Sequence, residues 1–184
     1  VVKAEILLHG SFATTGIGHG TDKALIAGLL GMRPDDIRIP DSFFLAKRDG
    51  MEFSFSTITL KDAHPNTAVL RLTGEHGRKI EVQAASIGGG RILIAKLDGI
   101  EVNFSAEKPT LIVHNVDQPG HVAQVTSMLA EKQVNIATLQ LYRDKRGGYA
   151  VMVIETDQEV PEESVAWLEQ LDGIIKVTYI NVEE

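Results

Sequence analysis

After residue 107 the spacing of apolar residues changes in a fixed order, and this order limits the possible folds more than any other feature. Apolar residues at helical spacing occupy His121–Lys132 and a shorter stretch between Pro161 and Gly173. Pro161 is expected at the first helical position, where its missing N–H costs nothing. Four further stretches have the composition of strands: Thr110–Asn115, Ile136–Arg143, Tyr149–Thr156 and Ile174–Asn181.

The resulting order βαββαβ predicts a ferredoxin-like plan, with four antiparallel strands and two helices on one face. The pattern changes near Ser105–Pro109, so we expect two domains, residues 1–106 and 107–184. The first domain is predicted to be a strand-rich mixed α/β domain with a helix over Asp22–Met32. Its expected strands are Lys3–Leu8, Met51–Leu60, Thr67–Thr73, Ile80–Ser86, Arg91–Leu97 and Ile100–Phe104. The fold class is therefore α+β.

Composition excludes several functions. The formal net charge of −7 argues against a nucleic-acid surface, which needs clustered Lys and Arg. The apolar stretches are too short to span a membrane, and with no secretory signal visible the cytoplasm is the expected compartment. The chain has no cysteine, so disulfides, thiolate catalysis and cysteine-ligated metals within this chain are excluded.

The stretch HGSFATTGIGHGTD, residues 9–22, is the most informative motif. Its glycines allow a close approach of backbone to a ligand, and the helix that follows favours an anion at its N-terminus. Its histidines can move protons near neutral pH. The alternative is a tight strand-to-helix connection with Thr21 or Asp22 as the N-cap. The candidate ligand-binding residues are His9, Gly10, Ser11, Thr14, Gly18, His19, Gly20 and Thr21.

Two further motifs lie in the first domain. In His64-Pro65-Asn66, the proline holds His64 in extended geometry beside a carboxamide, although Pro and Asn are also common in ordinary turns. In the segment 86–91, SIGGGR, consecutive glycines can form an anion-binding nest; the alternative is a flexible hairpin loop. Its candidate site residues are Ser86, Gly88 and Gly89.

A second candidate site lies where the first strand of the second domain meets its first helix, in VDQPGHV. A helix N-terminus, a carboxamide and a close-approach glycine suit the carboxylate and amine of a small amino acid. The alternative is a capped loop without a ligand. The candidate effector-binding residues are Asn115, Asp117, Pro119, Gly120, His121, Asn135 and Ile136.

Together these motifs resemble a known family. HGSFATTGIGHGTDKALIAGLLG, IPDSF, HPNTA and SIGGGRI are similar to the beta chain of bacterial iron–sulfur L-serine dehydratases, and DQPGHVAQVTSMLAEKQVNIATLQLYR resembles the ACT domain that follows it. The resemblance covers nearly the whole chain. Members of that family carry a Ser- and His-containing segment before the first strand; this sequence begins after that point, and no role is assigned to that histidine.

The resemblance implies conversion of L-serine to pyruvate and ammonia by a complex with a separate alpha chain. Cysteines of that alpha chain would hold a [4Fe–4S] cluster, and this chain would complete the active site and be inactive alone. It also allows a monovalent cation near the ACT loop and a homodimer through the ACT domains. We expect His19 to handle the proton, while His64 and Asn66 orient the substrate or the cluster loop. Ser11, Thr14 and the backbone near Gly20–Thr21 would bind the carboxylate.

Two other functions remain open from the sequence. Type 1 D-3-phosphoglycerate dehydrogenases carry a similar domain before a serine-binding ACT domain, so this chain could be an effector-binding regulatory module of such an enzyme. It could also be a stand-alone amino-acid-binding dimer.

Overall fold

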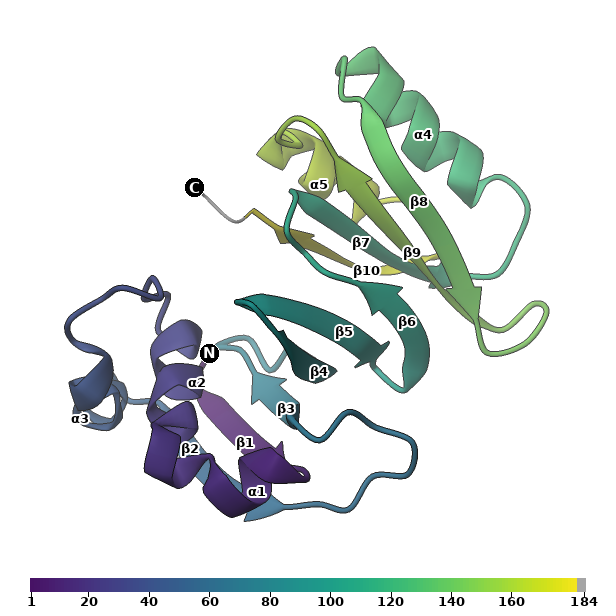
Figure 1. Ribbon diagram of the computed structural model, residues 1–184. Helices are drawn as coiled ribbons and strands as arrows, with labels where there is room; N and C mark the ends of the chain where they lie inside the picture. The colour runs from purple at the N-terminus through teal and green to yellow at the C-terminus, as the bar shows by residue number, and fades with distance from the viewer. Residues whose placement is uncertain (182–184) are drawn as a thin grey trace. The chain divides into compact units, whose positions relative to one another are not determined.

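The computed structural model describes residues 1–181 and consists of two compact units, Val1–Gly99 and a second unit that begins at Ile100 (Figure 1). The division falls earlier in the chain than the boundary expected after residue 106. Within the part of the chain that is described, no helix is long and apolar enough to cross a membrane.

The sheet of the first unit is built on a short parallel pair. Its strands follow the order β2-β1-β3-β4-β5, and β1 pairs in parallel with β2 but antiparallel with β3. The strands are β1 (Lys3–Leu8), β2 (Glu52–Thr57), β3 (Thr67–Thr73), β4 (Lys79–Gly88) and β5 (Arg91–Leu97). Strand β2 ends before the expected Leu60 because its neighbour β1 ends at Leu8, the partner of Thr57.

The parallel β1–β2 pair requires a crossover, and helices supply it. The elements are α1 (Ser11–Thr15), η1 (Ile17–His19), α2 (Thr21–Leu29), η2 (Ile39–Asp41) and α3 (Ser42–Arg48). The stretch after His9 was expected to be a loop, but it forms α1 and η1. Helix α2 ends before the expected Met32 because Gly31 adopts a left-handed φ of 78°. The buried Ser42 hydroxyl donates to the Lys23 carbonyl at 2.9 Å and ties α3 to α2.

The core of the first unit lies between its helices and sheet. Buried β1 side chains pack with α2 and α3, and the rings of Phe43, Phe53 and Phe55 pack together, with neighbouring centroids 5.0–6.2 Å apart. The buried cluster comprises Ala4, Ile6, Leu8, Ile26, Ala46, Met51 and Ala68. Burial of apolar surface stabilises the folded state by about 25 cal/mol per Å². Packing therefore fixes the position of β1, whose end leads into the His9 motif.

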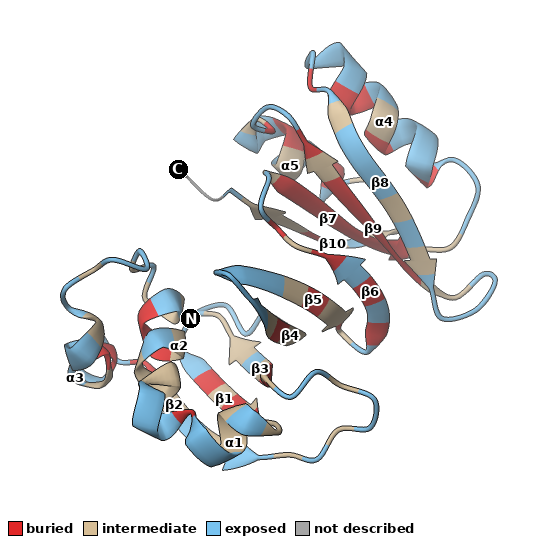
Figure 2. Cartoon of the chain, in the orientation of Figure 1, coloured by how far each residue is buried: buried red, intermediate tan, exposed pale blue. Residues whose placement is uncertain are grey.

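The second unit has the ferredoxin-like βαββαβ plan, which confirms the α+β class. Its antiparallel sheet has the order β10-β7-β9-β8, and the central strands β7 and β9 are almost entirely buried (Figure 2). The elements are β6 (Ile100–Phe104), β7 (Thr110–Val116), α4 (His121–Glu131), β8 (Ile136–Arg143), β9 (Tyr149–Thr156), α5 (Glu162–Leu168) and β10 (Ile174–Ile180). Pro161 is the N-cap of α5, not its first helical residue, because its ψ of 139° is extended.

Candidate functional site

The three motifs of the first unit meet at one end of its sheet. The Ser11 N–H donates to the Pro65 carbonyl at 2.8 Å, and the His9 N–H donates to the Thr67 carbonyl at 2.9 Å. The Ser86 N–H donates to the Asn66 carbonyl at 3.0 Å. The His-Gly-Ser and Ser-Ile-Gly-Gly-Gly segments are therefore both bonded to the His-Pro-Asn segment. The register of β1, β3 and β4 produces this arrangement, since the three segments extend from paired strand ends.

Gly10 makes the closest of these contacts possible. Its φ is 57°, and a Cβ built on it would lie 2.5 Å from the Pro65 carbonyl oxygen and 2.8 Å from the Pro65 Cα. Only glycine accepts both the positive φ and the backbone contact. The close approach expected of a glycine in this motif is thus made to Pro65 backbone.

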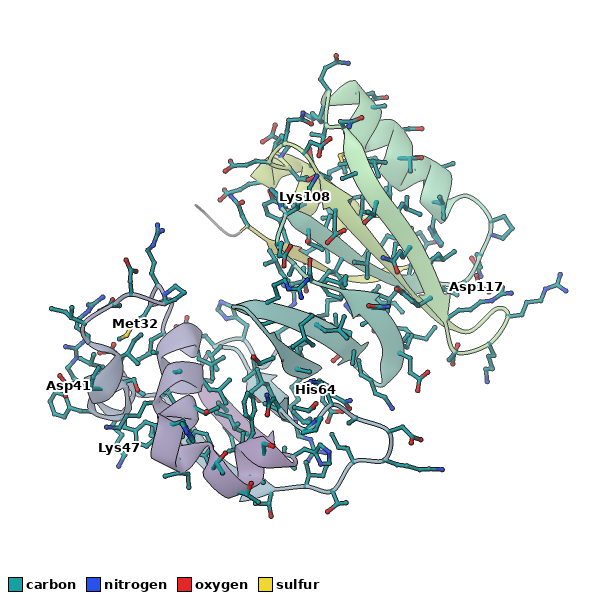
Figure 3. The ribbon with its side chains drawn as sticks, in the orientation of Figure 1. Met32, Asp41, Lys47, His64, Lys108 and Asp117 are labelled. Carbon is teal, nitrogen blue, oxygen red and sulfur yellow. The ribbon has the colours of Figure 1, made fainter. Side chains whose placement is uncertain are left out.

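Backbone groups fix the rings of His64 and His9. The Asn66 N–H donates to His64 Nδ1 at 3.1 Å, and a ring nitrogen that accepts an N–H carries no proton, so neutral His64 is protonated on Nε2. His9 Nδ1 lies 3.2 Å from the Leu60 nitrogen and 3.3 Å from the Ile58 carbonyl oxygen, so both tautomers find a partner. The exposed His64 (labelled in Figure 3) therefore presents an Nε2–H donor, and the half-buried His9 is held in place by backbone.

His19 has the opposite tautomer to His64. Its Nδ1 lies 2.8 Å from the Thr15 carbonyl oxygen, which can only accept, so Nδ1 carries the proton. Nε2 then bears a lone pair, and the ring is exposed. This arrangement suits a general base, because a carbonyl that holds Nδ1–H fixes the ring and its tautomer. The four-residue separation from Thr15 brings the two groups together because the chain is helical here.

The structure does not support the expected anion site at the start of α2. The Gly20 N–H donates to the Ile17 carbonyl and the Thr21 N–H to the Gly16 carbonyl, at 3.2 and 2.9 Å, so neither donor is open. The N-cap is Gly20, not Thr21 or Asp22. Asp22 instead accepts the Lys23 N–H at 2.8 Å and places its own carboxylate in the first turn.

The Thr14 hydroxyl is also hydrogen-bonded within its own helix. It donates to the carbonyls of Gly10 and Ser11, both at 3.3 Å. The exposed Ser11 is the hydroxyl residue that stands next to the Pro65 contact. Gly18 and His19 lie beyond α1, and no hydrogen bond joins them to residues 64–66 in the described chain.

The Ser86–Arg91 segment is the tip of the β4–β5 hairpin. Gly88, Gly89 and Gly90 have φ values of 89°, 64° and 76°, and Gly88 pairs with Arg91. An anion nest requires alternating right- and left-handed residues, so three successive positive φ values do not form one. The hairpin interpretation is correct, and of this motif only Ser86 is bonded to the His-Pro-Asn segment.

In the second unit, Asn115 and His121 lie around Gly173. Across the β7–β10 pair Asn115 faces Ile174, and the Val116 N–H donates to the Gly173 carbonyl at 2.9 Å. A Cβ on Gly173 would lie 2.6 Å from His121 Nε2. Asn115 Oδ1 and His121 Nε2 are buried and have no hydrogen-bond partner among residues 1–181. Buried polar atoms of this kind are costly unless something satisfies them.

Asp117 and Gly120 shape the loop before α4. Asp117 Oδ2 accepts the Gly147 N–H at 2.9 Å and the Arg143 guanidinium at 3.0 Å. These contacts, the Gly147 N–H first, lower the pKa of the Asp117 carboxyl. Gly120 is the N-cap of α4 with a φ of 107°, and Pro119 before it is exposed. Asp117 Oδ2 thus stabilises the loop.

Asn135 and Ile136 lie at the other end of the sheet within one chain. Asn135 Nδ2 donates to Asp157 Oδ2 at 2.6 Å, and its N–H donates to Gln158 at 2.7 Å. Asp157 pairs with Lys108, next to the start of β7, whereas Asn115 is near its end. Within one chain, α4 carries the backbone back along the sheet before β8 begins, so Asn135 and Ile136 lie away from Asn115. Gly173, which sequence reasoning missed, lies beside His121 and bonds Val116.

Comparisons with known proteins find a family match in each unit. The family model described as "Serine dehydratase beta chain" matches residues 1–48, and that described as "ACT domain" matches residues 109–173. The chain is 35% identical to the L-serine dehydratase beta chain of Peptoniphilus asaccharolyticus, over 98% of this chain and 82% of that protein. The chain belongs to the L-serine dehydratase beta chain family.

Two further relatives differ in how much of their length the chain matches. A probable L-serine dehydratase beta chain of Bacillus subtilis is 37% identical, over 95% of this chain and 79% of that protein. The D-3-phosphoglycerate dehydrogenase of Methanocaldococcus jannaschii is 31% identical over 61% of this chain, but this covers only 22% of the dehydrogenase. The likeness to the dehydratase beta chains thus spans both units and most of the relative.

Proposed function

We propose that this chain is the beta chain of an iron–sulfur L-serine dehydratase, which converts L-serine to pyruvate and ammonia together with an alpha chain. The observation that carries the proposal is the hydrogen-bonded junction of the His-Gly-Ser and His-Pro-Asn segments. It gathers two histidines held by backbone at one end of the sheet, in a chain of the dehydratase beta family.

The [4Fe–4S] cluster of such an enzyme does not fit the residues of this chain. The sequence has no cysteine, and the described residues contain no group of three or more His, Asp or Glu side chains that could hold a metal ion. The ligands of the cluster are therefore assigned to cysteines of the alpha chain. On this proposal the beta chain alone forms no pyruvate.

Serine elimination breaks the Cα–H bond and the Cβ–O bond. The α-proton goes to a base, and the hydroxyl takes up a proton and leaves as water, so that the net loss is one water molecule. The resulting enamine tautomerises to an imine, which a water molecule hydrolyses to pyruvate and ammonia. His19 is the base in this proposal, because its Nε2 lone pair is exposed while the Thr15 carbonyl holds Nδ1–H.

His64 serves as a donor. Its Nε2–H group suits a hydrogen bond to the substrate carboxylate or to a loop of the alpha chain. His9 and the exposed hydroxyl of Ser11 lie in the segment bonded to the same His-Pro-Asn turn and add polar groups there. In this proposal these side chains bind the substrate in place of the Gly20 and Thr21 N–H groups, which are hydrogen-bonded within the chain.

The ACT unit is proposed to bind a small amino acid at Asn115, Gly120 and His121. Its support is the pair of buried, unpartnered atoms, Asn115 Oδ1 and His121 Nε2. Both are acceptors, since Gln124 Oε1 can take the His121 Nδ1–H at 3.3 Å, so a ligand ammonium would satisfy them. Calorimetric titration with L-serine should show binding that Asn115→Ala abolishes. Titration curves that are identical for the two proteins would remove this site from the proposal.

A homodimer through the second units is also proposed. Leu139 and Leu141 are 37% and 46% exposed on β8, the outer strand of the four-stranded sheet. Exposed strand edges with apolar side chains are ready interaction surfaces. Sedimentation velocity should give a dimer mass that Leu141→Glu reduces to a monomer mass; a monomeric wild-type chain would contradict the dimer.

The function is tested by reconstitution. The chain would be co-expressed with a cysteine-bearing alpha chain from the same genome, purified without oxygen, and assayed for pyruvate from L-serine. Pyruvate formation that requires both chains is the expected result. If the folded chain binds L-serine but neither binds the alpha chain nor supports turnover, the effector-binding regulatory module becomes the better account.

A further inference from the structure

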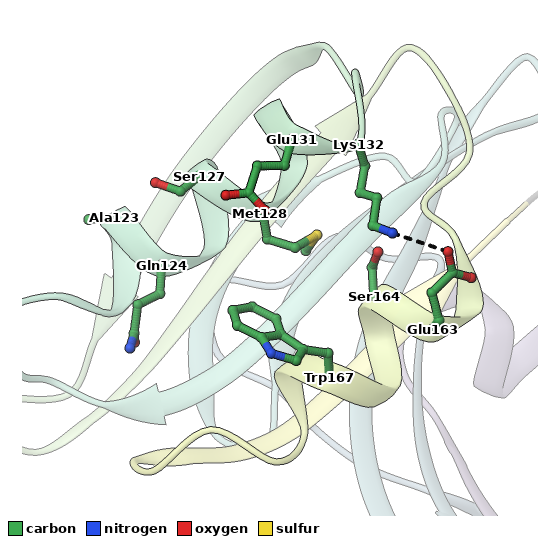
Figure 4. A pocket seen from close by; sticks show the side chains of 9 residues that line it. All are labelled: Ala123, Gln124, Ser127, Met128, Glu131, Lys132, Glu163, Ser164 and Trp167. Carbon is green, nitrogen blue, oxygen red and sulfur yellow. Dashed lines mark hydrogen bonds and ion pairs between the residues drawn. The ribbon is translucent and has the colours of Figure 1, made fainter.

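A groove in the second unit lies between α4 and α5, outside both sites described above. Its volume is about 610 Å³, within the range of roughly 300–1,000 Å³ typical of small-molecule sites. One wall comes from Ala123, Gln124, Ser127, Met128, Glu131 and Lys132, and the other from Glu163, Ser164 and Trp167 (Figure 4).

The apolar part of the groove is formed by Trp167 and Met128. Trp167 is 44% exposed, whereas Met128 is 6% exposed. Figure 4 shows the indole extending across the groove toward the side chains of α4. A large exposed aromatic surface beside a buried thioether favours an apolar occupant, because burying such a ring removes a large area from water.

The polar end carries two opposite charges close together. Lys132 Nζ lies 3.2 Å from Glu163 Oε1, with Glu131 on the same wall. Both partners are largely exposed, so this ion pair stabilises the fold little and can be opened at small cost. Ser164 lies beside the pair in Figure 4, is 1% exposed, and has a buried hydroxyl without a hydrogen-bond partner among residues 1–181.

We propose that this groove binds a free α-amino acid with a large apolar side chain. Its carboxylate pairs with Lys132 and its ammonium with Glu163, so that neither charge is left uncompensated when the ion pair opens. The ligand head group supplies the partner that the Ser164 hydroxyl lacks, and the side chain packs against Trp167 and Met128. A ligand with a single charge would pair with only one of Lys132 and Glu163 and leave the other without a partner. The inference does not rest on the dehydratase proposal.

Trp167 is the single tryptophan of the chain and therefore reports directly on the groove. Titration of the full chain with L-phenylalanine should change its fluorescence saturably. 2-Phenylethylamine lacks the carboxylate and 3-phenylpropionate lacks the ammonium, and each should bind at least about tenfold more weakly, the factor for roughly 1.4 kcal/mol. Equal affinity for the three probes would overturn the proposal, as would no saturable change.

Matched variants separate this groove from the other site. Lys132→Gln and Ser164→Ala should weaken L-phenylalanine binding measured by calorimetry, whereas Lys145→Gln, in the β8–β9 turn, should not. Circular dichroism confirms that each variant is folded. Loss of binding in Asn115→Ala but not in Lys132→Gln would assign the amino acid to the loop before α4 and overturn the proposal. A fluorescence change that depends on the protein concentration and not on the ligand concentration would show that a second copy of the chain covers this groove. That result would also overturn the proposal.

Discussion

In the first unit a glycine lies against backbone, whereas in the second a glycine lies against a side chain. Gly10 faces the carbonyl of Pro65, and Gly173 faces the imidazole of His121. A backbone contact cannot move without disturbing the strands that flank it, but an imidazole can rotate. The first junction is therefore a fixed arrangement set by sheet register, and the second can adjust when a ligand arrives.

The two regions also differ in how their polar atoms are satisfied. His9 and His64 lie within hydrogen-bond distance of backbone N–H groups, and His19 donates to a carbonyl. In the second unit, Asn115 Oδ1 and His121 Nε2 are buried without a partner in the described chain. A preorganised site suits chemistry, whereas unsatisfied buried atoms suit a site that a ligand completes.

The largest effect is expected from Gly10→Ala. The new Cβ would meet the Pro65 carbonyl at 2.5 Å in a left-handed conformation, so the unfolding free energy should fall by roughly 3 kcal/mol. Hydrogen exchange should show lost protection at the amides of His9 and Ser11, which bond to Thr67 and Pro65.

Gly77→Ala is the matched control for this change. Gly77 has a φ of 73°, but no atom lies within 4 Å of the position that a Cβ would take there, so only the cost of the left-handed backbone, about 1 kcal/mol, applies. Equal destabilisation by the two substitutions would show that the Pro65 contact is not a rigid junction.

Gly173→Ala should have a smaller effect, about 2 kcal/mol, because the His121 ring can move away from the new methyl group. It should also abolish amino-acid binding at the loop before α4. Gly147→Ala, at a similar φ of 72° without a neighbouring atom within 4 Å, isolates the backbone cost. If Gly173→Ala binds L-serine as the wild type does, His121 is not part of that site.

The smallest effect concerns pH. The Gly147 N–H and then Arg143 lower the pKa of Asp117 in the folded state. Its contribution to stability is therefore present above the unfolded pKa of about 3.9 and is lost progressively as pH falls from there through the lower folded-state pKa. Between pH 7 and pH 3, urea midpoints followed by Trp167 fluorescence should fall less in Asp117→Asn than in the wild type.

Arg143→Gln tests the order of the two causes. Because the Gly147 N–H is the larger one, this variant should keep most of the wild-type pH dependence. A loss as large as that of Asp117→Asn would show that the guanidinium dominates, and unchanged pH dependence in Asp117→Asn itself would contradict the assignment.

The strands were predictable because their composition and period follow directly from burial. Strands β1, β3, β5, β6, β8 and β9 have the predicted bounds. Helix α1 and η1 were not predictable, because residues 11–19 are rich in Gly, Ser and Thr, which have low helix propensity. The bond between His19 and Thr15 depends on that helix, so the tautomer of His19 could not be read from the sequence.

The candidate effector site shows what distance along the sequence hides. Asn135 follows the loop motif closely in the sequence, but the eleven residues of α4 carry the chain back by roughly 16 Å. Gly173 is far away in the sequence and was missed because only the pairing of β10 with β7 brings it next to Asn115. Nearness in the sequence predicts nearness in space only within one motif. Strand pairing, which the sequence does not show, brings the separate motifs together.

The turnover of a reconstituted complex that carries His19→Gln tests most directly whether His19 is the base. Glutamine can still donate to the Thr15 carbonyl, but it provides no basic nitrogen. The variant should assemble with the alpha chain, yet form pyruvate from L-serine at least about a hundredfold more slowly than the wild type. Near-normal pyruvate formation by the assembled variant would show that His19 is not the base.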